Sequence, residues 1–396
     1  MYVLMKDFSK PVKVCMISYL HDLFDDRIYW KESIALKDNG FEVCCIGVTQ
    51  TPVNEVSKEG IRLVGLTKNI KSGIVGKFEL LFSHKSIFNK LINAAESEKA
   101  DVYHIHDFHL NRIGPALKRL EHSPRVIYDV HEPFPITLTS TIKGNALSTV
   151  KNAIKRYLLN FWEKRMSGKY DLIITTENHV AEKFKKHLPN KPVSVIWNYS
   201  NLKKNGSVKP IYDFIYCGGL MERRGASEMI RAINTLKNRG LNPKLLIIGT
   251  IFSTELQQKM NRFIEKNRLS ENVIIISHVQ YRDIASYYEL SQFSLALFKN
   301  IEVNRIIMPI KIFEYITMGL PVVCSNFGHM NEITSTHQTG ITVNPGSIEE
   351  ISNAMERLMT DSEMASQLKI NCQKAAVKFD WEKMNIKLVD LYNNLL

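Results

Sequence analysis

Cysteine pairs and long apolar segments are missing from this sequence. Its six cysteines form no C-x-x-C pair and mostly stand in apolar runs, which is typical of reduced core residues rather than of disulfides or a zinc site. No apolar run approaches the ~18 residues that span a bilayer, and residues 1–11 lack the apolar core of a signal peptide. We therefore expect a cytoplasmic protein.

Recognition motifs for nucleic acid are missing as well, although the net charge is +12. Much of the cationic excess lies in residues 68–92, with five lysines against one glutamate, and in residues 143–169, with seven lysines and arginines against one glutamate. Both segments carry apolar residues at helical spacing, such as Val150, Ile154 and Phe161. Basic amphipathic helices bind anionic membrane surfaces, and a solvated helix face is the alternative. We predict peripheral contact with the inner face of the cell membrane and no nucleic-acid partner.

Short apolar runs rich in valine and isoleucine alternate with longer helical stretches along a chain long enough for two domains. This alternation indicates parallel sheets covered on both faces. The predicted strands span residues 12–18, 42–48, 61–66, 101–105, 125–130, 171–175, 193–197, 212–217, 244–248, 272–276, 293–298 and 321–324. The polar stretch 201–210 is typical of a linker. The fold class is therefore α/β, with two doubly wound parallel-sheet domains and a cleft between them.

Polar or glycine residues follow several of these strands. Open parallel sheets bind ligands beyond the carboxyl ends of their strands. His106 and Asp107 follow one predicted strand, and His131 follows the next. In the second half of the chain, Gly218 and Gly219 follow a strand. We expect the active site to lie where these two edges face each other.

The stretch CGGLMERRGASEMIRAI (217–233) reads as a strand, a glycine turn, two arginines and a helix. Glycines let the backbone approach a phosphate, the helix N-terminus offers free N–H groups, and Arg223 and Arg224 add positive charge. This combination suits the diphosphate of a nucleotide. The alternative is an ordinary strand–helix turn with surface arginines.

Two further stretches place histidines at strand ends. In HIHDFH (104–109) the order of residues differs from that of metallo-hydrolases, so we expect no metal and a substrate-contacting or supporting role for His106. His131 could donate to a substrate hydroxyl, or it could cap the next element. In DDRI (25–28) the aspartates suit a helix N-terminus, whereas Arg27 in the first turn suggests an anionic partner.

The stretch MPIKIFEYITMGLPVVCSN (308–326) reads as a short helix followed by a buried strand. Glu314 stands among apolar residues on this helix, and a carboxylate in such a place needs a hydrogen-bonding partner. The two neighbouring hydroxyls of a ribose would provide one. The alternative is an exposed ion pair with Lys311, three residues earlier, which would contribute only a few tenths of a kcal/mol.

The order of these motifs resembles the retaining glycosyltransferases of family 4, which have two Rossmann-like domains in the GT-B fold. The resemblance covers most of the chain and rests on residues 25–43, 100–107, 126–132, 170–184, 218–225, 309–323 and 340–358. It implies an acceptor-binding domain at 1–200 and a nucleotide-sugar-binding domain at 211–378. A C-terminal helix within 379–396 would pack back on the first domain.

The resemblance also implies a reaction. A hexosyl group would pass from a nucleotide-sugar, with UDP favoured and GDP next, to a hydroxyl of a glycan or lipid-linked glycan, with retained anomeric configuration. No essential metal and no other cofactor are implied. The setting would be the biosynthesis of a surface polysaccharide, such as capsule or lipopolysaccharide. The alternatives are a nucleotide-sugar epimerase on the same fold, a non-catalytic partner subunit, and a metal hydrolase built on HIHDFH.

Individual residues carry family roles under this resemblance. Glu314 matches the glutamate that binds the ribose hydroxyls, and Arg224 stands where the family has a lysine that contacts the diphosphate. His131 matches a histidine that contacts the transferred sugar, and Gly218 matches a turn glycine. The implied catalytic residues are therefore His131, Arg224 and Glu314.

The sequence departs from the family pattern at two positions. Gly219 replaces the signature arginine, so Arg223 or Lys311 would supply the missing charge. Ile306 replaces the first acid of the family's Glu-x7-Glu pair, which leaves room for a non-catalytic member. The implied donor-binding set is Gly218, Gly219, Arg223, Arg224, Lys311 and Glu314.

Overall fold

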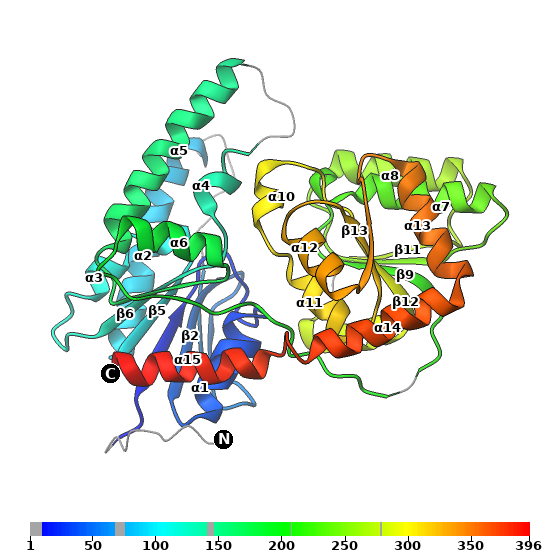
Figure 1. The fold of residues 1–396 in the computed structure, drawn as a ribbon. Coiled ribbons are helices and arrows are strands. Elements are labelled where there is room, and N and C mark those ends of the chain that lie inside the picture. The colour runs from blue at the N-terminus through cyan, green and yellow to red at the C-terminus, as the bar shows by residue number, and fades with distance from the viewer. Residues whose placement is uncertain (1–9, 68–75, 141–145, 207, 278) are drawn as a thin grey trace. The chain divides into compact units, whose positions relative to one another are not determined.

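A computed structural model describes residues 10–67, 76–140, 146–206, 208–277 and 279–396. The chain forms two compact units, and each is described here by itself (Figure 1). Unit 1 comprises the described residues within Met1–Thr139, Asn145–Asn198 and Glu382–Leu396. Unit 2 comprises those within Ser140–Gly144 and Tyr199–Trp381.

Unit 1 is built on an eight-stranded sheet in the order β3-β4-β2-β1-β5-β6-β7-β8. All neighbouring strands are parallel except the edge pair β3 and β4. The strands are β1 (Lys13–Ile17), β2 (Glu42–Thr49), β3 (Val53–Val56), β4 (Arg62–Thr67), β5 (Val102–His106), β6 (Arg125–Val130), β7 (Leu172–Thr175) and β8 (Val193–Val195). The central strands are buried over most of their length, and β5 is buried throughout, because helices cover both faces of a parallel sheet.

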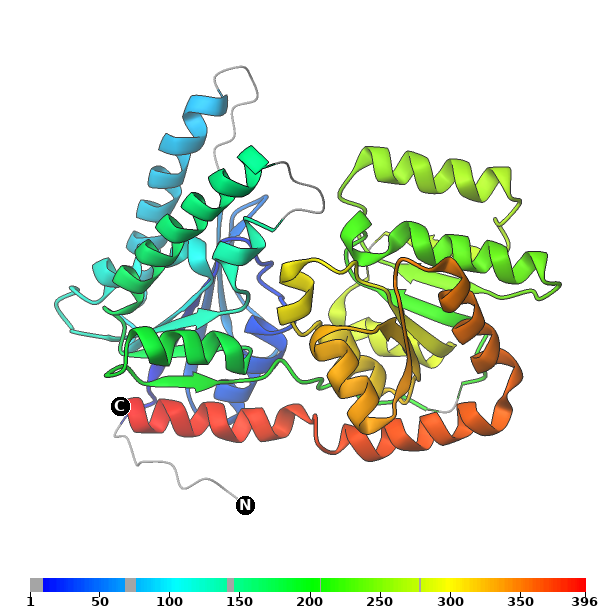
Figure 2. The ribbon, with the colours of Figure 1, turned by 45° about the horizontal axis from the view of Figure 1, so that its top comes forward.

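Helices on the two faces of this sheet shield its apolar core. They are the π-helical turn η1 (Ile28–Ser33), α1 (Ile34–Asp38), α2 (Gly76–Glu98), the 3-10 turn η2 (Phe108–Leu110), α3 (Gly114–Leu117), α4 (Phe134–Thr137), α5 (Ala146–Ser167), α6 (Asn178–His187) and α15 (Trp381–Leu395). In Figures 1 and 2 the last helix, α15, runs beside α1 at the end of the chain. Its buried residues Leu388, Val389 and Tyr392 complete the core of this unit.

Unit 2 repeats the layered plan with a six-stranded, fully parallel sheet in the order β11-β10-β9-β12-β13-β14. The strands are β9 (Tyr212–Cys217), β10 (Leu245–Ile248), β11 (Val273–Ile276), β12 (Ser291–Ala296), β13 (Val322–Ser325) and β14 (Gly340–Val343). The helices are η3 (Glu222–Arg224), α7 (Ala226–Asn238), α8 (Thr254–Lys266), η4 (Tyr281–Asp283), α9 (Ile284–Glu289), α10 (Glu302–Ile306), α11 (Ile310–Thr317), α12 (Gly328–His337), α13 (Ile348–Thr360) and α14 (Ser362–Ala376). Side-chain caps begin several of these helices: Ser253, Ser347 and Asp361 each accept a backbone N–H of the first turn.

Every strand predicted from the apolar runs is present, so the α/β fold class with parallel sheets is confirmed. Two strands were missed. The edge strand β3 has the sequence VNEV and is largely exposed, so it lacks the apolar run of a central strand. The other, β14, begins at Gly340, and glycine weakens the strand signal.

Candidate functional site

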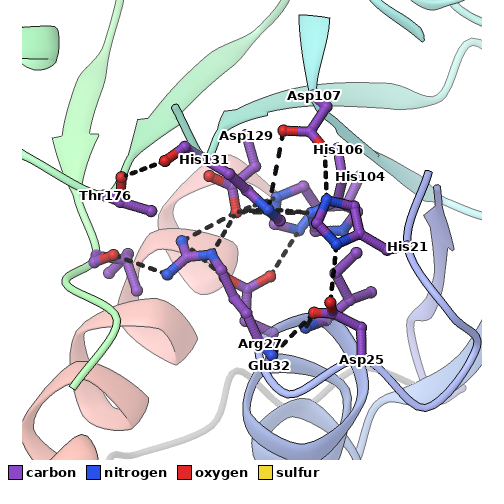
Figure 3. A network of polar contacts seen from close by, with 12 residues as sticks. His21, Asp25, Arg27, Glu32, His104, His106, Asp107, Asp129, His131 and Thr176 are labelled. Atoms are coloured by element: carbon purple, nitrogen blue, oxygen red, sulfur yellow. Dashed lines mark hydrogen bonds and ion pairs between the residues drawn. The ribbon is translucent and has the colours of Figure 1, made fainter. Parts of the chain in front are cut away.

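A network of charged and imidazole side chains lies at the carboxyl ends of β1, β5 and β6 in unit 1 (Figure 3). His104 and His106 stand on β5, and because successive residues of a strand alternate, both side chains point to one face. Asp129 of β6 is in direct register with His106. The loop after β1 and the turn η1 add His21, Asp25, Arg27 and Glu32.

Asp25 precedes η1, which begins at Ile28, and its side chain caps this turn as the sequence predicted. Its carboxylate accepts the backbone N–H groups of Arg27 and Ile28, both at 2.9 Å. The same carboxylate contacts Nδ1 of His21 at 2.8 Å, and Nε2 of His21 faces Asp107. Although burial lowers the pKa of His21, these two carboxylates raise it to about 11, so the ring is an imidazolium near neutral pH.

The anionic partners expected for Arg27 are carboxyl groups inside the protein. The side chain is 2% exposed, and its Nε and Nη2 donate to Asp129 at 3.1 and 2.9 Å. Nη2 also lies 2.9 Å from Glu32, and Nη1 donates to the carbonyl of Ile196 at 2.9 Å. Arg27 thus ties three elements of unit 1 together.

The pKa values of the two buried carboxyl groups beside Arg27 shift in opposite directions. Burial opposes ionisation of Asp129, but Arg27 and the neighbouring imidazoles hold the pKa of this carboxyl well below its usual range. Burial raises the pKa of Glu32 well above its usual range, and the adjacent Asp129 charge raises it further. Arg27 therefore favours the charged form of Asp129 more strongly than that of Glu32.

His104 and His106 are fully buried and stack on each other, with ring centroids 4.4 Å apart. Burial lowers the pKa of both rings, to about 4 for His106, so both are neutral. Nδ1 of His104 shares a 2.8 Å hydrogen bond with the hydroxyl of Tyr392 on α15. Because His106 is fully buried, the structure favours a supporting role for this residue over direct contact with the substrate.

His131 forms the edge of this network. Nδ1 of His106 and Nε2 of His131 share a hydrogen bond of 3.1 Å, and the His131 carbonyl accepts the hydroxyl of Thr176 at 2.9 Å. Its ring stands edge-on to His21, with centroids 4.9 Å apart. The alternative role as a helix cap is wrong, because Pro133 is the N-cap of α4 and no side chain caps that helix.

The residue types in this network would suit a metal, but Arg27 already lies among them. One donor atom from each of Glu32, His104, His106 and Asp129 lies within 4.8 Å of the others. The guanidinium of Arg27 contacts both of these carboxylates, so a cation could bind there only by displacing it. A second group, His21, Asp107 and His131, includes the imidazolium of His21, which has no lone pair for a metal.

The predicted donor-binding residues of unit 2 gather at the end of β9. Gly218 adopts φ +133°, and a Cβ atom there would lie only 2.8 Å from Nζ of Lys311. Gly219 is next in the chain, and its carbonyl lies 3.5 Å from Nη1 of Arg224. The backbone of Gly218 can occupy this conformation so close to Lys311 because it has no side chain.

Lys311 is buried on α11 and is 4% exposed, so the alternative of an exposed Lys311–Glu314 pair is wrong. Its ammonium lies 3.8 Å from the ring centroid of Tyr216. Among the residues that the structure describes, Nζ has no hydrogen-bond partner. Burial, with the nearby positive charge of Arg224, lowers the pKa of Lys311 well below its usual range.

Glu314 is 5% exposed and accepts the hydroxyl of Tyr288 at 2.7 Å. The helix that carries it is fixed to the sheet by Tyr315, whose hydroxyl accepts the N–H of Cys217 at 3.2 Å and donates to the carbonyl of Leu295 at 3.2 Å. These bonds hold Lys311 and Glu314 beside the end of β9.

Arg223 and Arg224 lie on the turn η3, directly before α7. The carbonyl of Arg223 accepts the N–H of Lys299 at 2.9 Å and the side-chain amide of Asn304 at 3.1 Å. Arg224 stands with its guanidinium carbon 5.8 Å from the ring centroid of Phe298. The structure brings Gly218, Gly219, Arg224 and Lys311 together, and Ile306 is the last residue of α10.

Two family profiles together match most of the chain. The profile described as "Glycosyltransferase Family 4" matches residues 32–203, and the one described as "Glycosyl transferases group 1" matches residues 200–375. The chain belongs to the family 4 glycosyltransferases of the GT-B fold.

Curated relatives of this glycosyltransferase are distant. An uncharacterized glycosyltransferase of Methanocaldococcus jannaschii is 23% identical over 309 residues, which are 76% of this chain and 78% of the relative. The capsular polysaccharide biosynthesis glycosyltransferase CapM of Staphylococcus aureus is 24% identical over 46% of each chain.

Solved structures share the fold of this glycosyltransferase over nearly its whole length. Sucrose-phosphate synthase from Thermosynechococcus elongatus superposes with a TM-score of 0.73 at 16% identity, covering 97% of this chain and 99% of that one. HepE from Anabaena, solved in complex with UDP and glucose, gives 0.65 at 13% identity, covering 96% and 99%. At sequence identities this low, the similarity shows a shared fold and nothing more.

The sequence did not reveal several parts of the network in this glycosyltransferase. Asp129, Glu32 and Tyr392 were not singled out, and His21 was not given a role. For Asp129 and Glu32 the signal was available, because a charged residue inside a buried strand or helix needs a buried partner. For Tyr392 no local signal exists, since its partner His104 lies 288 residues away.

Proposed function

We propose that this glycosyltransferase transfers a hexosyl group from a nucleotide-sugar to a hydroxyl of a glycan or lipid-linked glycan, with retention and without an essential metal. UDP is the favoured nucleotide and GDP the next. The observation that carries this proposal is the buried ammonium of Lys311 beside Gly218, with Arg224 close by. A buried amino group that lacks a hydrogen-bond acceptor among the described residues can take up a proton and bind an anion such as a diphosphate.

Stabilising the leaving diphosphate is the main chemical requirement of such a reaction. Negative charge grows on the diphosphate as the bond to the sugar breaks, and fixed cations in a site with little water stabilise that charge strongly. Lys311 and Arg224 would provide these cations. Because Gly218 and Gly219 have no side chains, the phosphates could approach their backbone closely. Lys311 would thereby supply the charge that the family places at position 219.

Glu314 would hold the nucleotide by its ribose. One carboxylate oxygen is oriented by Tyr288, so the carboxylate is fixed in direction before any ligand binds. A carboxylate accepts two hydroxyl donors well, which suits the 2′ and 3′ positions of a ribose. His131 in unit 1 would contact the transferred sugar. That it does so across a cleft between the units stays a prediction.

The choice of UDP and of a surface polysaccharide draws support from two similar proteins. HepE was solved with UDP and glucose, and CapM is described as acting in capsular polysaccharide biosynthesis. Capsule or lipopolysaccharide assembly in the cytoplasm, next to the membrane, is therefore our proposed setting.

Calorimetric titration of the protein with UDP, GDP, ADP and their sugar conjugates, in a metal chelator, tests the donor site. We expect one nucleotide to bind, and Glu314→Ala to weaken that binding by at least about tenfold, since it removes two charge-assisted hydrogen bonds. The exposed Glu332→Ala serves as the matched control and should bind like the wild type. Failure of every nucleotide to bind the folded protein would overturn the donor-site assignment.

Ile306 favours a second candidate function, a non-catalytic partner subunit. The family's acid at this position is absent, and an isoleucine cannot accept hydrogen bonds from a sugar. This candidate predicts that the nucleotide binds but that no sugar is released from the donor, with or without acceptor. Donor turnover, measured as the release of free UDP, therefore distinguishes an enzyme from a partner subunit.

Membrane contact also belongs to this proposal, and the structure changes where we place it. Part of the segment 68–92 lies outside the described residues. Its described apolar residues Ile87, Phe88 and Leu91 are buried in the core of unit 1, so they cannot face a membrane. No described helix has the length and apolarity needed to cross a membrane. The proposal therefore rests on α5 alone.

The apolar residues of α5 form an exposed stripe. They recur at spacings of three and four, so that at 100° per residue they span an arc of roughly 100°. They are Leu147, Val150, Ile154, Tyr157, Leu158 and Phe161, and Tyr157 is 72% exposed. Lys151, Lys155, Lys164 and Arg165 are exposed on the same helix. An apolar stripe with cations beside it matches a bilayer that carries anionic lipids.

Vesicle flotation tests this surface. We expect the wild type to float with vesicles of phosphatidylglycerol and to stay free of phosphatidylcholine vesicles. The double variant Leu158→Glu, Phe161→Glu should lose flotation, whereas Val56→Glu, at an exposed apolar residue of β3, should keep it. Unchanged flotation of the double variant would overturn the assignment. A wild-type dimer that the double variant converts to a monomer, without lipid binding, would place a second copy on the stripe.

A further inference from the structure

The last helix of the chain reaches the proposed site through a chain of aromatic and imidazole side chains. Tyr392 is fully buried on α15 and shares a 2.8 Å hydrogen bond with Nδ1 of His104. The ring of His104 stacks on His106, and His106 shares a 3.1 Å hydrogen bond with His131. We propose that Tyr392 is a positioning residue that holds His131 in place through His104 and His106. This inference rests on the proposed role of His131 in contacting the transferred sugar.

The direction of the first hydrogen bond follows from the surroundings of His104. The pKa of Tyr392 is raised well above its usual range by burial, so its hydroxyl keeps its proton and can donate. Nε2 of His104 lies 3.7 Å from the ionised Asp129, which favours a proton on that nitrogen. Because neutral His104 carries one ring proton, Nδ1 is then the acceptor for Tyr392. The hydroxyl thus selects one tautomer and one orientation of this ring.

The stack passes that orientation to the next ring. His104 and His106 lie with an interplanar angle of 28°, so a rotation of one ring would move it against the other. Nδ1 of His106 and Nε2 of His131 lie 3.6 and 3.5 Å from the same oxygen of Asp129. A single carboxylate oxygen therefore faces all three imidazoles, and the placement of each affects the others.

This arrangement explains polar groups that packing alone does not require. A buried tyrosine hydroxyl and two buried imidazoles could be replaced by apolar side chains with little loss of stability. Within the described residues, Nε2 of His106 has no hydrogen-bond partner, so the stack is not optimised for stability. This unpaired nitrogen indicates that the stack has a function other than support of the core. We assign that function as the orientation of His131, the one ring of the series that is partly exposed.

The variant Tyr392→Phe removes only the hydroxyl. It keeps the ring that packs against Phe41, with centroids 5.7 Å apart. The control is Leu388→Ala, which weakens the packing of α15 at a fully buried residue that has no polar atom in the network. Both variants are compared with the full-length wild type, and their thermal stabilities are recorded.

The first readout is nuclear magnetic resonance of the ring nitrogens in protein labelled with 15N-histidine, with His131 assigned by loss of its signal in His131→Gln. We expect Tyr392→Phe to shift the signals of His104, His106 and His131, and Leu388→Ala to leave all three in place. A shift confined to His104 would overturn the proposal. So would an equal shift of His131 in Leu388→Ala.

The second readout is transfer activity at saturating donor. We expect Tyr392→Phe to lower kcat by about three- to tenfold, the effect of one buried hydrogen bond, while the Kd of the nucleotide stays unchanged. Leu388→Ala should keep the wild-type kcat per folded molecule. If the wild type transfers no sugar at all, the proposed function fails, and the resonance measurement still decides the positioning role.

Discussion

Burial of Lys311 opposes stability, and we attribute its presence to the proposed binding of the donor. Its ammonium is buried beside Tyr216, and the pKa of this group is well below its usual range because burial disfavours the charge. A methionine of similar length would fill the same space without that cost. The family resemblance assigned Lys311 to the donor site, but the sequence left open an exposed pair with Glu314, because which face of this short helix is buried depends on its tertiary packing.

We predict that Lys311→Met keeps or raises the melting temperature and lowers sugar transfer by about 10²- to 10³-fold, the usual effect of removing one stabilising group from a leaving anion. Calorimetry and donor turnover measure the two quantities. Lys369→Met, at a partly buried lysine of α14, is the control and should keep wild-type transfer. A fall in stability together with unchanged transfer would contradict the assignment of Lys311 to the donor site.

Protonation of Lys311 should be linked to nucleotide binding. A diphosphate favours the charged ammonium, so binding raises the pKa of Lys311 toward its ordinary range and takes up a proton from solution. The affinity for UDP should therefore fall as pH rises. Titration in buffers of different ionisation enthalpy should show this uptake in the wild type and its absence in Lys311→Met.

Register between strands assembles the network at the scale of elements. His106 of β5 and Asp129 of β6 are opposite each other, and η1 brings Arg27 to the same edge. The strands could be predicted because their apolar runs are local. Their pairing and the approach of η1 join residues that are not neighbours in the chain, and Arg27 lies 102 positions from Asp129, so a single sequence holds no periodic signal for them.

We predict that Arg27→Gln lowers the free energy of unfolding by about 3–5 kcal/mol, because it leaves the buried Asp129 charge uncompensated. Arg62→Gln, which removes an exposed partner of Glu98, should change it by less than about 1 kcal/mol. Denaturation in urea measures both. Equal effects of the two variants would show that Arg27 does not form a buried ion pair that stabilises the fold. Adding Asp129→Asn to Arg27→Gln should restore part of the loss.

The loop after β1 should give unfolding a pH dependence. The pKa of His21 is raised from 6.5 to about 11 by Asp107 and Asp25, so the folded protein holds a proton that the unfolded chain releases above pH 6.5. The stability that His21 adds is complete below pH 6.5 and is lost as pH rises toward 11. Urea unfolding of the wild type and His21→Gln at pH 6, 8 and 10 should show a difference that shrinks with pH. A difference that grows with pH would rule out this assignment.

At the scale of the whole molecule, the residues proposed to bind the donor lie in one unit. Gly218, Arg224, Lys311 and Glu314 all belong to unit 2, whose own hydrophobic core is continuous from β9 to α14. We predict that residues 199–381 expressed alone fold and bind the nucleotide with a Kd within about threefold of the full chain. The same fragment with Glu314→Ala is the control for specific binding. A folded fragment without affinity would mean that unit 1 contributes to the nucleotide site.

Unit 1, by contrast, depends on a distant segment, because the C-terminal end of the chain completes its core. From Glu382 onward, α15 belongs to unit 1 and supplies buried side chains to its core. A C-terminal helix that packs back was expected only from the family resemblance. Its consequence, a hydrogen bond between residues 392 and 104, could not be expected from either segment.

The sequence by itself determined what depends on neighbours in the chain. Apolar runs, glycine turns and helix caps act over a few residues, so the strands, the two parallel sheets and the glycine turn after β9 could be predicted. Tertiary structure alone decided which charges are buried together. Arg27 meets Asp129 and Glu32, Lys311 lies against Gly218, and Tyr392 meets His104, because the free energy of a buried charge depends on partners that only folding brings near.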